Sequence, residues 1–470
     1  MFDVDSPQTF GQRVGAPDAV GSGWGRGLTH RGIVRRWGWG VNGCVPADGM
    51  RVDVGGRGIG YGGRRSLYYS PATRLTDVNR GCNMPVSCEQ LLQAMVGFDT
   101  VNSNISGAAD AELALSKYLD DLARDMGLAT RRLPVSGQGF NLLVSHEVAA
   151  EAPWLLFESH LDTVSVEGMT VDPFAGAIRG GRLYGRGACD TKGTGAAMLW
   201  ALREYAQGVG GPNNVAIVFT LDEEIYKTGV RTFVAEQLPG LGWRPAGVVV
   251  GEPTRLLPVV AHNGVVRWSI RTRGQAAHSS DPAQGRSAIS AMVAVVRALE
   301  TEYIPRLTAS HPLTGKAQCS VNMIAGGVQI NIVPEHCAIH VDRRVVPGED
   351  PRDIQPAVEA VLEQLRRRDP NLEVVQDEPA MVDSPLDPSG GEAFATFVAA
   401  VLADLAMPAQ LQGVGYGTDA SSFGLAGIPA VVLGPGDIAQ GHTADEWIDV
   451  AELNRGVEVY AALMRTAAKD

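Results

Sequence analysis

The chain has 470 residues, 45% hydrophobic and 20% charged, which is typical of a globular protein with two or three domains. Its net charge of −12 argues against nucleic acid as the main partner. The sequence has no apolar run of the about 18 residues that a membrane span requires, and its first residues lack the pattern of a secretory signal. Its six cysteines form no disulfide framework, so we expect a reduced, cytoplasmic protein without a membrane partner.

Residues 1–83 differ in composition from the rest of the chain. They contain 18 of the 57 glycines and 11 arginines, but no lysine and no glutamate. No helical or strand period runs through them, so we expect a disordered, low-complexity extension or translated upstream sequence. The alternative is an RNA-binding arm, whose affinity would depend on salt. Met84 opens a segment typical of a natural start, in which Ser87 can cap a helix.

From residue 84 to residue 263, buried strands alternate with helices. Continuous apolar runs of strand length predict the strands Trp154–Glu158, Val215–Leu221 and Ala246–Val250, and the segments between and after them predict the helices Thr191–Ala206 and Val230–Gln237. Apolar strands separated by helices predict an α/β fold with a mostly parallel sheet covered on both faces. We assign residues 84–263 to the first part of a main domain.

The pattern changes after residue 263 and changes back near residue 378. In between, the sequence predicts the strands Val265–Arg273, Val321–Ile324, Ile330–Val333 and Ala338–Arg344 and the helices Ser287–Glu300 and Asp353–Arg367. This combination predicts a compact α+β domain inserted over residues 264–377. The main domain resumes over residues 378–470, with a helix at Gly391–Ala406 and a strand at Ala430–Leu433.

Polar residues follow the predicted strands of the main domain at the points where the strands end. They are His160 and Asp162 after the first strand, Asp222, Glu223 and Glu224 after the second, Glu252 after the third and His442 beyond the last. In an open parallel sheet, the loops at the carboxyl ends of the strands converge on one crevice. Histidines and carboxylates gathered there predict a metal site rather than a set of solvated surface charges.

The number of candidate ligands suits two metal ions better than one. Two imidazoles and several carboxylates exceed what one tetrahedral zinc uses, and two divalent ions that share a carboxylate can activate a water and polarise a carbonyl. Neighbouring residues point in different directions, so one of Glu223 and Glu224 can bind metal while the other takes the water's proton. Asp162 is placed to orient the imidazole of His160.

An ordered set of motifs resembles the M20 family of metallopeptidases. The motifs are SHLDTV (159–164), YGRGACDTKG (184–193), TLDEEI (220–225), GEPT (251–254), AAHSS (276–280), DRRVVPGE (342–349), GTDASSF (417–423) and GPGDIAQGHTADEW (434–447). The resemblance covers residues 84–470. It implies a zinc- or cobalt-dependent peptidase fold, in which a catalytic domain is interrupted by a lid that also forms a homodimer.

The resemblance also implies roles for individual residues. Asp190 would bridge two metal ions, one completed by His160 and Glu252 and the other by Glu224 and His442. Glu223 would be the general base and Asp162 the carboxylate behind His160, and the peptide bond between Asp190 and Thr191 would be cis. His278 in the lid would reach the active site of a partner subunit. The substrate contacts would be Asn331, Arg344, whose guanidinium suits a carboxylate, and Gly417, whose lack of a side chain leaves room for the substrate backbone. For these three residues a lid salt bridge or a plain turn is an equal alternative.

The motifs GEPT and GPGDIAQGHTADEW look closest to the branch of acetylornithine deacetylase and succinyl-diaminopimelate desuccinylase. This similarity implies a two-metal amidohydrolase that removes the acyl group of an N-acyl amino acid, with Zn²⁺, or Co²⁺ or Mn²⁺ instead. A dipeptidase or carboxypeptidase acting on short peptides would use the same residues. A binding protein that has lost catalysis is a further alternative, although the sequence retains every ligand and Glu223.

Overall fold

The computed structural model describes residues 84–137, 139–208 and 210–468. The prediction for residues 1–83 therefore lies outside the described part of the chain. Among the described helices, none combines the length and the apolar character that a membrane span requires.

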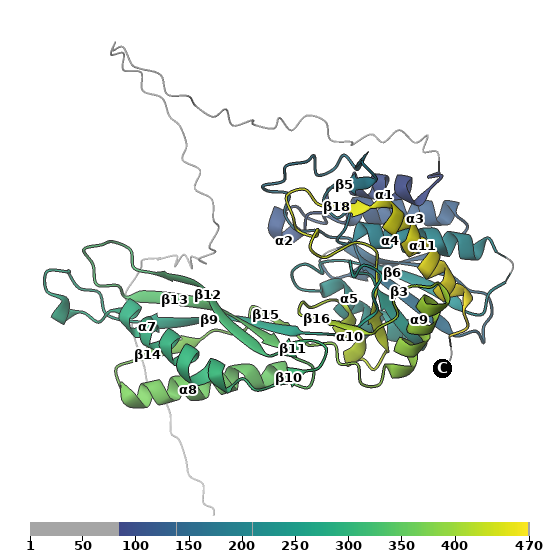
Figure 1. The fold of residues 1–470 in the computed structure, drawn as a ribbon. Helices are drawn as coiled ribbons and strands as arrows, with labels where there is room; N and C mark the ends of the chain where they lie inside the picture. Colours follow the sequence, from purple (N-terminus) through teal and green to yellow (C-terminus); the bar gives the residue numbers. More distant parts are fainter. Residues whose placement is uncertain (1–83, 138, 209, 469–470) are drawn as a thin grey trace, which may run out of the picture. The chain divides into compact units, whose positions relative to one another are not determined.

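The main sheet has eight strands, with parallel strands at its centre (Figure 1). In spatial order they are β1 (Ala129–Val135), β2 (Gly139–His146), β6 (Asn214–Thr220), β3 (Trp154–His160), β7 (Pro245–Val250), β17 (Ala430–Val432), β8 (Val259–His262) and β16 (Gln412–Val414). The four strands from β6 to β17 run parallel to one another. Strands β1 and β2 continue the sheet antiparallel on one side, and β8 pairs antiparallel with β17 on the other. The predicted α/β fold with a mostly parallel sheet is confirmed.

Both faces of the main sheet are covered, which explains why its central strands are apolar throughout. Leu155 and Phe157 of β3 belong to a buried cluster with residues of α1 (Cys88–Val96), α3 (Leu113–Asp125), α4 (Lys192–Ala206), α9 (Glu392–Asp404) and α11 (Val450–Arg465). Leu156, which points to the opposite face, packs in a second cluster that contains Phe233 and Phe423. The second cluster draws on α5 (Thr228–Thr232), the π-helical turn Phe233–Gln237, α6 (Leu238–Leu241) and α10 (Ala420–Leu425). The helix predicted over Val230–Gln237 is thus divided between α5 and the π-helical turn that follows it.

The first described helix, α1, is fixed by its cap and by the burial of its apolar face. Helix α1 begins after Ser87, whose side chain accepts a hydrogen bond from the backbone N–H of Gln90, as the sequence predicted. The apolar face of α1 is fully buried against the main core.

A protein that begins at Met84 is therefore expected to fold on its own. We expect its melting temperature to lie within about 2 °C of that of the full chain, because a shift of that size corresponds to at most about 2 kcal/mol in a protein of this size. Circular dichroism melts of the two proteins, measured side by side with their hydrolytic activity, would check this. A clearly lower melting temperature and activity would show that residues 1–83 contribute to the core.

The insertion contains its own sheet and its own core. The strands are ordered β12 (Gln318–Gly326), β13 (His336–Val345), β9 (Gly264–Arg273) and β14 (Glu373–Gln376), and β15 (Met381–Asp383) also pairs with β9. Along β9 the burial alternates, because one face packs against helices α7 (Ala288–Ala298) and α8 (Ile354–Arg368). Strand β15 lies after residue 377, so this sheet includes a segment from the predicted second part of the main domain. The division of the chain into domains stays a prediction.

The strand predicted over Ile330–Val333 is wrong. This segment lies in the loop between β12 and β13, where only Ile332 forms an isolated bridge, with His278. The side chain of Ile330 is fully exposed (103%). The apolar pattern alone misled the prediction, because Gly327 with a φ of 79° and Pro334 interrupt the chain on either side of the segment.

Candidate metal centre

The predicted ligands meet at the carboxyl ends of the parallel strands. His160 is the last residue of β3, Glu224 lies just after β6 and Glu252 just after β7. His442 lies between β17 and β18 (Trp447–Asp449), and Asp190 lies two residues before the start of α4. Parallel strands end at one edge of a sheet, and this places residues that are more than 200 positions apart in the sequence in one site.

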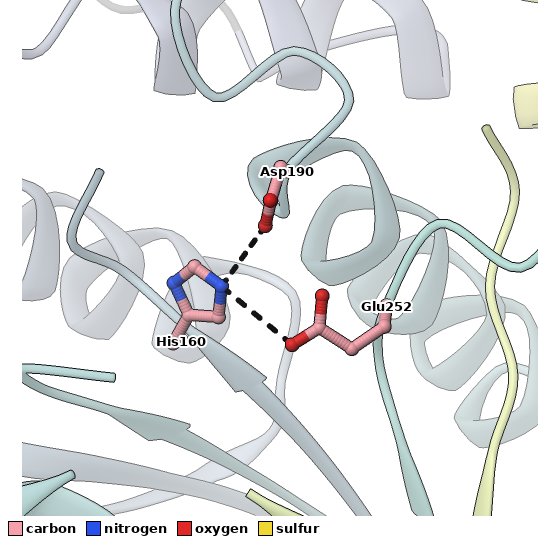
Figure 2. Close-up of side chains that lie close together, drawn as sticks. All are labelled: His160, Asp190 and Glu252. Atoms are coloured by element: carbon pink, nitrogen blue, oxygen red, sulfur yellow. Dashed lines mark hydrogen bonds and ion pairs between the residues drawn. The ribbon is translucent and has the colours of Figure 1, made fainter. Parts of the chain in front are cut away.

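The first group of candidate ligands is His160, Asp190 and Glu252, all buried (Figure 2). The Nε2 atom of His160 lies 3.2 Å from Oδ1 of Asp190 and 3.9 Å from Oε1 of Glu252. One imidazole nitrogen and two carboxylate oxygens thus point at a common centre.

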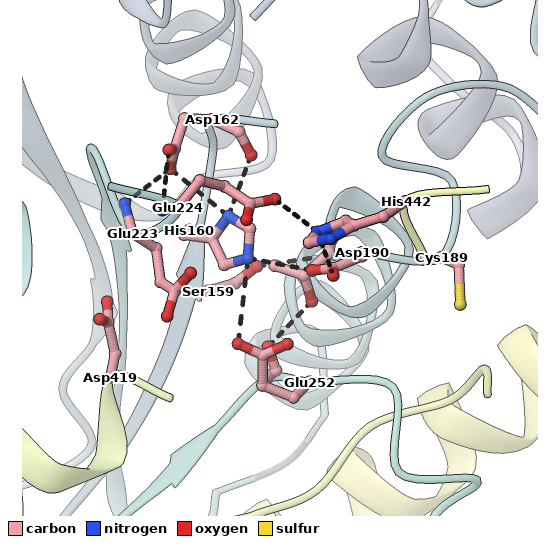
Figure 3. Close-up of polar contacts among 12 residues, drawn as sticks. Ser159, His160, Asp162, Cys189, Asp190, Glu223, Glu224, Glu252, Asp419 and His442 are labelled. Atoms are coloured by element: carbon pink, nitrogen blue, oxygen red, sulfur yellow. Dashed lines mark hydrogen bonds and ion pairs between the residues drawn. The ribbon is translucent and has the colours of Figure 1, made fainter. Parts of the chain in front are cut away.

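The second group is Asp190, Glu224 and His442. The Nε2 atom of His442 lies 3.2 Å from Oδ2 of Asp190 and 3.1 Å from Oε1 of Glu224 (Figure 3). Asp190 is therefore shared, with one carboxylate oxygen directed at each histidine. Within each group the ligand atoms lie within 4.8 Å of one another. This donor set of two nitrogens and three carboxylates suits two divalent cations bridged by Asp190.

Asp190 is fixed in place by a buried carboxylate that the sequence reasoning missed. Glu446 accepts hydrogen bonds from the backbone N–H groups of Cys189 (2.9 Å) and Asp190 (3.1 Å) and from the guanidinium of Arg186 (2.6 Å). The peptide bond between Asp190 and Thr191 is cis, as the family resemblance implied. Glu446 stands in the quoted motif GHTADEW, but nothing in the spacing distinguishes it from a surface acid.

Asp162 lies behind His160, on the side of the ring opposite the candidate metals. The Nδ1 atom of His160 donates to the backbone carbonyl of Asp162 at 3.0 Å, and the carboxylate Oδ1 of Asp162 lies 3.5 Å away. These contacts leave Nε2 free to face the metals. Asp162 also accepts the backbone N–H groups of Glu223 (2.9 Å) and Glu224 (3.1 Å) and the side chain of Asn102 (2.8 Å). One buried carboxylate thereby fixes the imidazole ligand and the backbone of both glutamates.

Glu223 and Glu224 point to different partners. The carboxylate of Glu224 faces His442, whereas that of Glu223 belongs to neither candidate group and lies beside Asp419 (Figure 3). Oε1 of Glu223 lies 3.3 Å from Nζ of the buried Lys227. Glu224 can therefore bind metal, while Glu223 can act as the base.

The comparisons with known proteins agree with this geometry. The family model described as Peptidase family M20/M25/M40 matches residues 156–466. The chain belongs to this family. It is 32% identical to an acetylornithine deacetylase of Yersinia pseudotuberculosis serotype O:1b over 80% of this chain and 96% of that protein. The acetylornithine deacetylase of Myxococcus xanthus is 32% identical over 65% of this chain and 78% of that protein.

Solved structures share the fold at lower identity. An M20 family metallo-carboxypeptidase of Sulfolobus solfataricus aligns with a TM-score of 0.68 and 16% identity, covering 80% of this chain and 98% of its own. A tripeptidase of Staphylococcus aureus aligns with a TM-score of 0.65 and 21% identity, covering 82% and 98%. These two likenesses show the M20 fold.

The charges of this M20 site are arranged to receive cations. Hydrogen bonds that His442 donates to Asp190 and Glu224 raise its pKa to about 11, and burial raises the pKa of Glu224 to about 7. Burial alone would lower the pKa of His160, but its contacts with Asp162 and Asp190 hold it well above its usual value. Raised pKa values mean that protons compete with a metal ion for the two imidazoles, so we expect the affinity for metal to rise with pH.

The residues that were predicted to contact the substrate or to reach the active site of a partner subunit lie outside the two ligand groups. Asn331 is exposed in the loop after β12, Arg344 pairs with Asp342 at 2.8 Å, and His278 is exposed and contacts Ser280. Within the described residues, none of these three side chains forms a hydrogen bond or ion pair with a candidate ligand. A Cβ at Gly417 would lie 2.8 Å from Oδ2 of Asp383, so a side chain there would displace this carboxylate.

Proposed function

We propose that this chain is a two-metal amidohydrolase that removes the acyl group from an N-acyl amino acid. The observation that carries the proposal is the sharing of Asp190 between two histidine-containing ligand groups. Membership of a peptidase family makes the chain a hydrolase of amide bonds, and the curated acetylornithine deacetylases favour an acyl amino acid as substrate. We propose Zn²⁺ as the metal, with Co²⁺ or Mn²⁺ as alternatives.

In this proposal each residue has one task. His160 and Glu252 would hold one metal ion, Glu224 and His442 would hold the other, and Asp190 would contribute to both. When bound, two such ions would supply a water of lowered pKa and a polarised substrate carbonyl. Glu223 would accept a proton from the attacking water at its carboxylate and return it to the leaving amine nitrogen. Burial raises the pKa of Glu223, and the nearby Lys227 opposes this rise.

Hydrolysis assays test the substrate class. The purified protein, supplied with Zn²⁺, Co²⁺ or Mn²⁺ in turn, is incubated with N-acetylornithine, N-succinyl-diaminopimelate, other N-acyl amino acids and dipeptides, and released amine is measured. We expect the N-acyl amino acids to be cleaved with the highest kcat/KM. Cleavage of dipeptides alone would establish the alternative, a dipeptidase or carboxypeptidase. No cleavage of any substrate by fully metal-loaded protein would favour a binding protein.

Removal of the metals is expected to abolish activity and to lower the melting temperature. The buried carboxylates of Asp190, Glu224 and Glu252 repel one another without cations, and ligands bound only by the folded state stabilise it by about 2.7 kcal/mol at a concentration 100 times Kd. Melting curves with chelator and after addition of excess Zn²⁺ would show the loss and its recovery. An unchanged melting temperature and rate after verified metal removal would contradict the two-metal proposal.

We also propose that the protein is a cytoplasmic homodimer formed through the insertion. Strand β12 ends the insertion sheet and pairs only with β13 among the described strands. Its apolar side chains Met323 and Ile324 are exposed, as is Val293 of α7. An unpaired strand edge beside exposed apolar side chains is suited to pairing with a second copy.

A further inference from the structure

A buried ammonium group lies next to the proposed base. Lys227 follows β6 and directly precedes α5, and its side chain is only 4% exposed. Its Nζ atom lies 2.9 Å from Oδ2 of Asp383 and 3.3 Å from Oε1 of Glu223. Lys227 therefore links the base to a second carboxylate that is far away in the sequence.

Asp383 belongs to the insertion sheet. It is the last residue of β15, where its backbone pairs with Val265 at the start of β9. Ser421 donates a hydrogen bond to Oδ1 of Asp383 at 3.2 Å, and a Cβ on Gly417 would collide with Oδ2. The carboxylate of Asp383, which pairs with Lys227, is thus fixed by its own contacts. It lies where the chain enters and leaves the insertion.

Lys227 lies in a mainly acidic surrounding, in which the half-exposed Arg231 is a second positive charge, 4.0 Å from Asp383. Asp419 is buried and acts on Lys227 electrostatically, as do Asp383 and Glu223. Burial alone would lower the pKa of Lys227, but these carboxylates raise it, so the ammonium stays charged. His262 is also close, and burial together with Lys227 lowers its pKa to about 4, which leaves it neutral.

We infer that Lys227 is a positioning residue that fixes the carboxylate of Glu223 toward the reacting water and ties it to Asp383 at the base of the insertion. This inference rests on the proposed function. Lys227 forms no contact with the candidate metal ligands in the described structure, so it acts on the base and not on metal binding. A glutamate side chain has several rotatable bonds, and a displacement of about 1 Å can lower a rate about 100-fold.

The test uses Lys227→Met together with a variant that keeps the charges balanced. Lys227→Met alone leaves Asp383 buried without a cation and is expected to lower the melting temperature. The double variant Lys227→Met/Asp383→Asn removes both charges and is expected to recover most of that loss. If Lys227 positions the base, kcat should still fall about 10- to 100-fold in the double variant, with KM within threefold and two metal ions per chain.

Arg231→Met serves as the matched control. Arg231 also reaches Asp383, at 4.0 Å, and donates to the carbonyl of Val382, but it is half-exposed and does not contact Glu223. We expect its kcat to stay within twofold of the unmodified protein. If the double variant regains full kcat along with its stability, the Lys227–Asp383 pair is only structural and the inference is wrong.

A structural measurement keeps the inference separate from the proposed function. Crystal structures of the double variant and of Arg231→Met, both soaked with Zn²⁺, should show the Glu223 carboxylate displaced in the first and unchanged in the second. An unmoved Glu223 in the double variant would overturn the inference. This result does not depend on whether the protein hydrolyses N-acyl amino acids, which the assays on the unmodified protein decide.

Discussion

Replacing Glu223 by glutamine is expected to lower kcat by a factor of about 10²–10⁴ while both metal ions stay bound. Glutamine has nearly the same shape but cannot accept the proton of the water. The carboxylate of Glu223 belongs to neither ligand group, and the backbone N–H of residue 223 would still donate to Asp162. Kinetics on the substrate found in the hydrolysis assays, with metal content from elemental analysis, measures both quantities.

Glu224→Gln is the matched comparison, because it makes the same chemical change one residue away. Oε1 of Glu224 lies 3.1 Å from the imidazole of His442 in the second ligand group. We therefore expect this variant to lose about one metal ion per chain, and to regain some activity when metal is added in excess. Equal metal loss in the two variants would contradict the division of roles between the neighbouring glutamates.

The sequence predicted the parts of the site that follow from sheet topology. His160, Glu224 and Glu252 each lie at or just after the end of a strand of the parallel centre, and the strands could be recognised because they are mainly apolar. Asp190 does not follow a strand, so strand ends alone did not reveal it. Its assignment depended on the resemblance of the motif GRGACDTKG to the M20 family.

The residues that support the site could not be predicted from periodicity. Asn102, Lys227 and Glu446 are buried polar groups in or beside loops, where a sequence pattern cannot distinguish them from solvated residues. Their roles depend on partners that are distant in the sequence, such as Asp162 for Asn102 and Asp383 for Lys227. The same limit explains the error at Ile330–Val333, because an apolar run predicts a strand only where a neighbouring strand is available to pair with it.

Substitution of His278 is the second change from which we expect a large loss of kcat. We propose that this residue acts in the active site of a partner subunit. Its Nδ1 atom accepts a hydrogen bond from the backbone N–H of Ser280 at 3.2 Å, and the Ser280 hydroxyl lies 2.8 Å away. A backbone N–H can only donate, so the proton of the neutral ring is on Nε2. The exposed Nε2 can then donate a hydrogen bond to the oxyanion that forms when water adds to the substrate carbonyl.

His278→Ala is accordingly expected to lower kcat by about 10²–10³, the loss typical of one missing oxyanion donor. Its melting temperature should change little, because the side chain is exposed and its partner Ser280 is exposed too. Ser280→Ala is the matched control. It removes the hydroxyl beside Nδ1 but keeps the backbone N–H that sets the tautomer, so its effect on kcat should be far smaller.

A mixing experiment decides whether His278 acts across the dimer. Glu223→Gln and His278→Ala are each expected to be nearly inactive alone. After subunit exchange about half of the dimers contain one chain of each kind. In such a dimer the subunit with an intact Glu223 receives His278 from its partner, so one of the two sites is complete and about a quarter of the unmodified activity should return. If His278 served its own chain, no mixed dimer would contain a complete site. Activity that stays at the level of the separate variants, despite exchange proven by mass spectrometry, would exclude the action in trans.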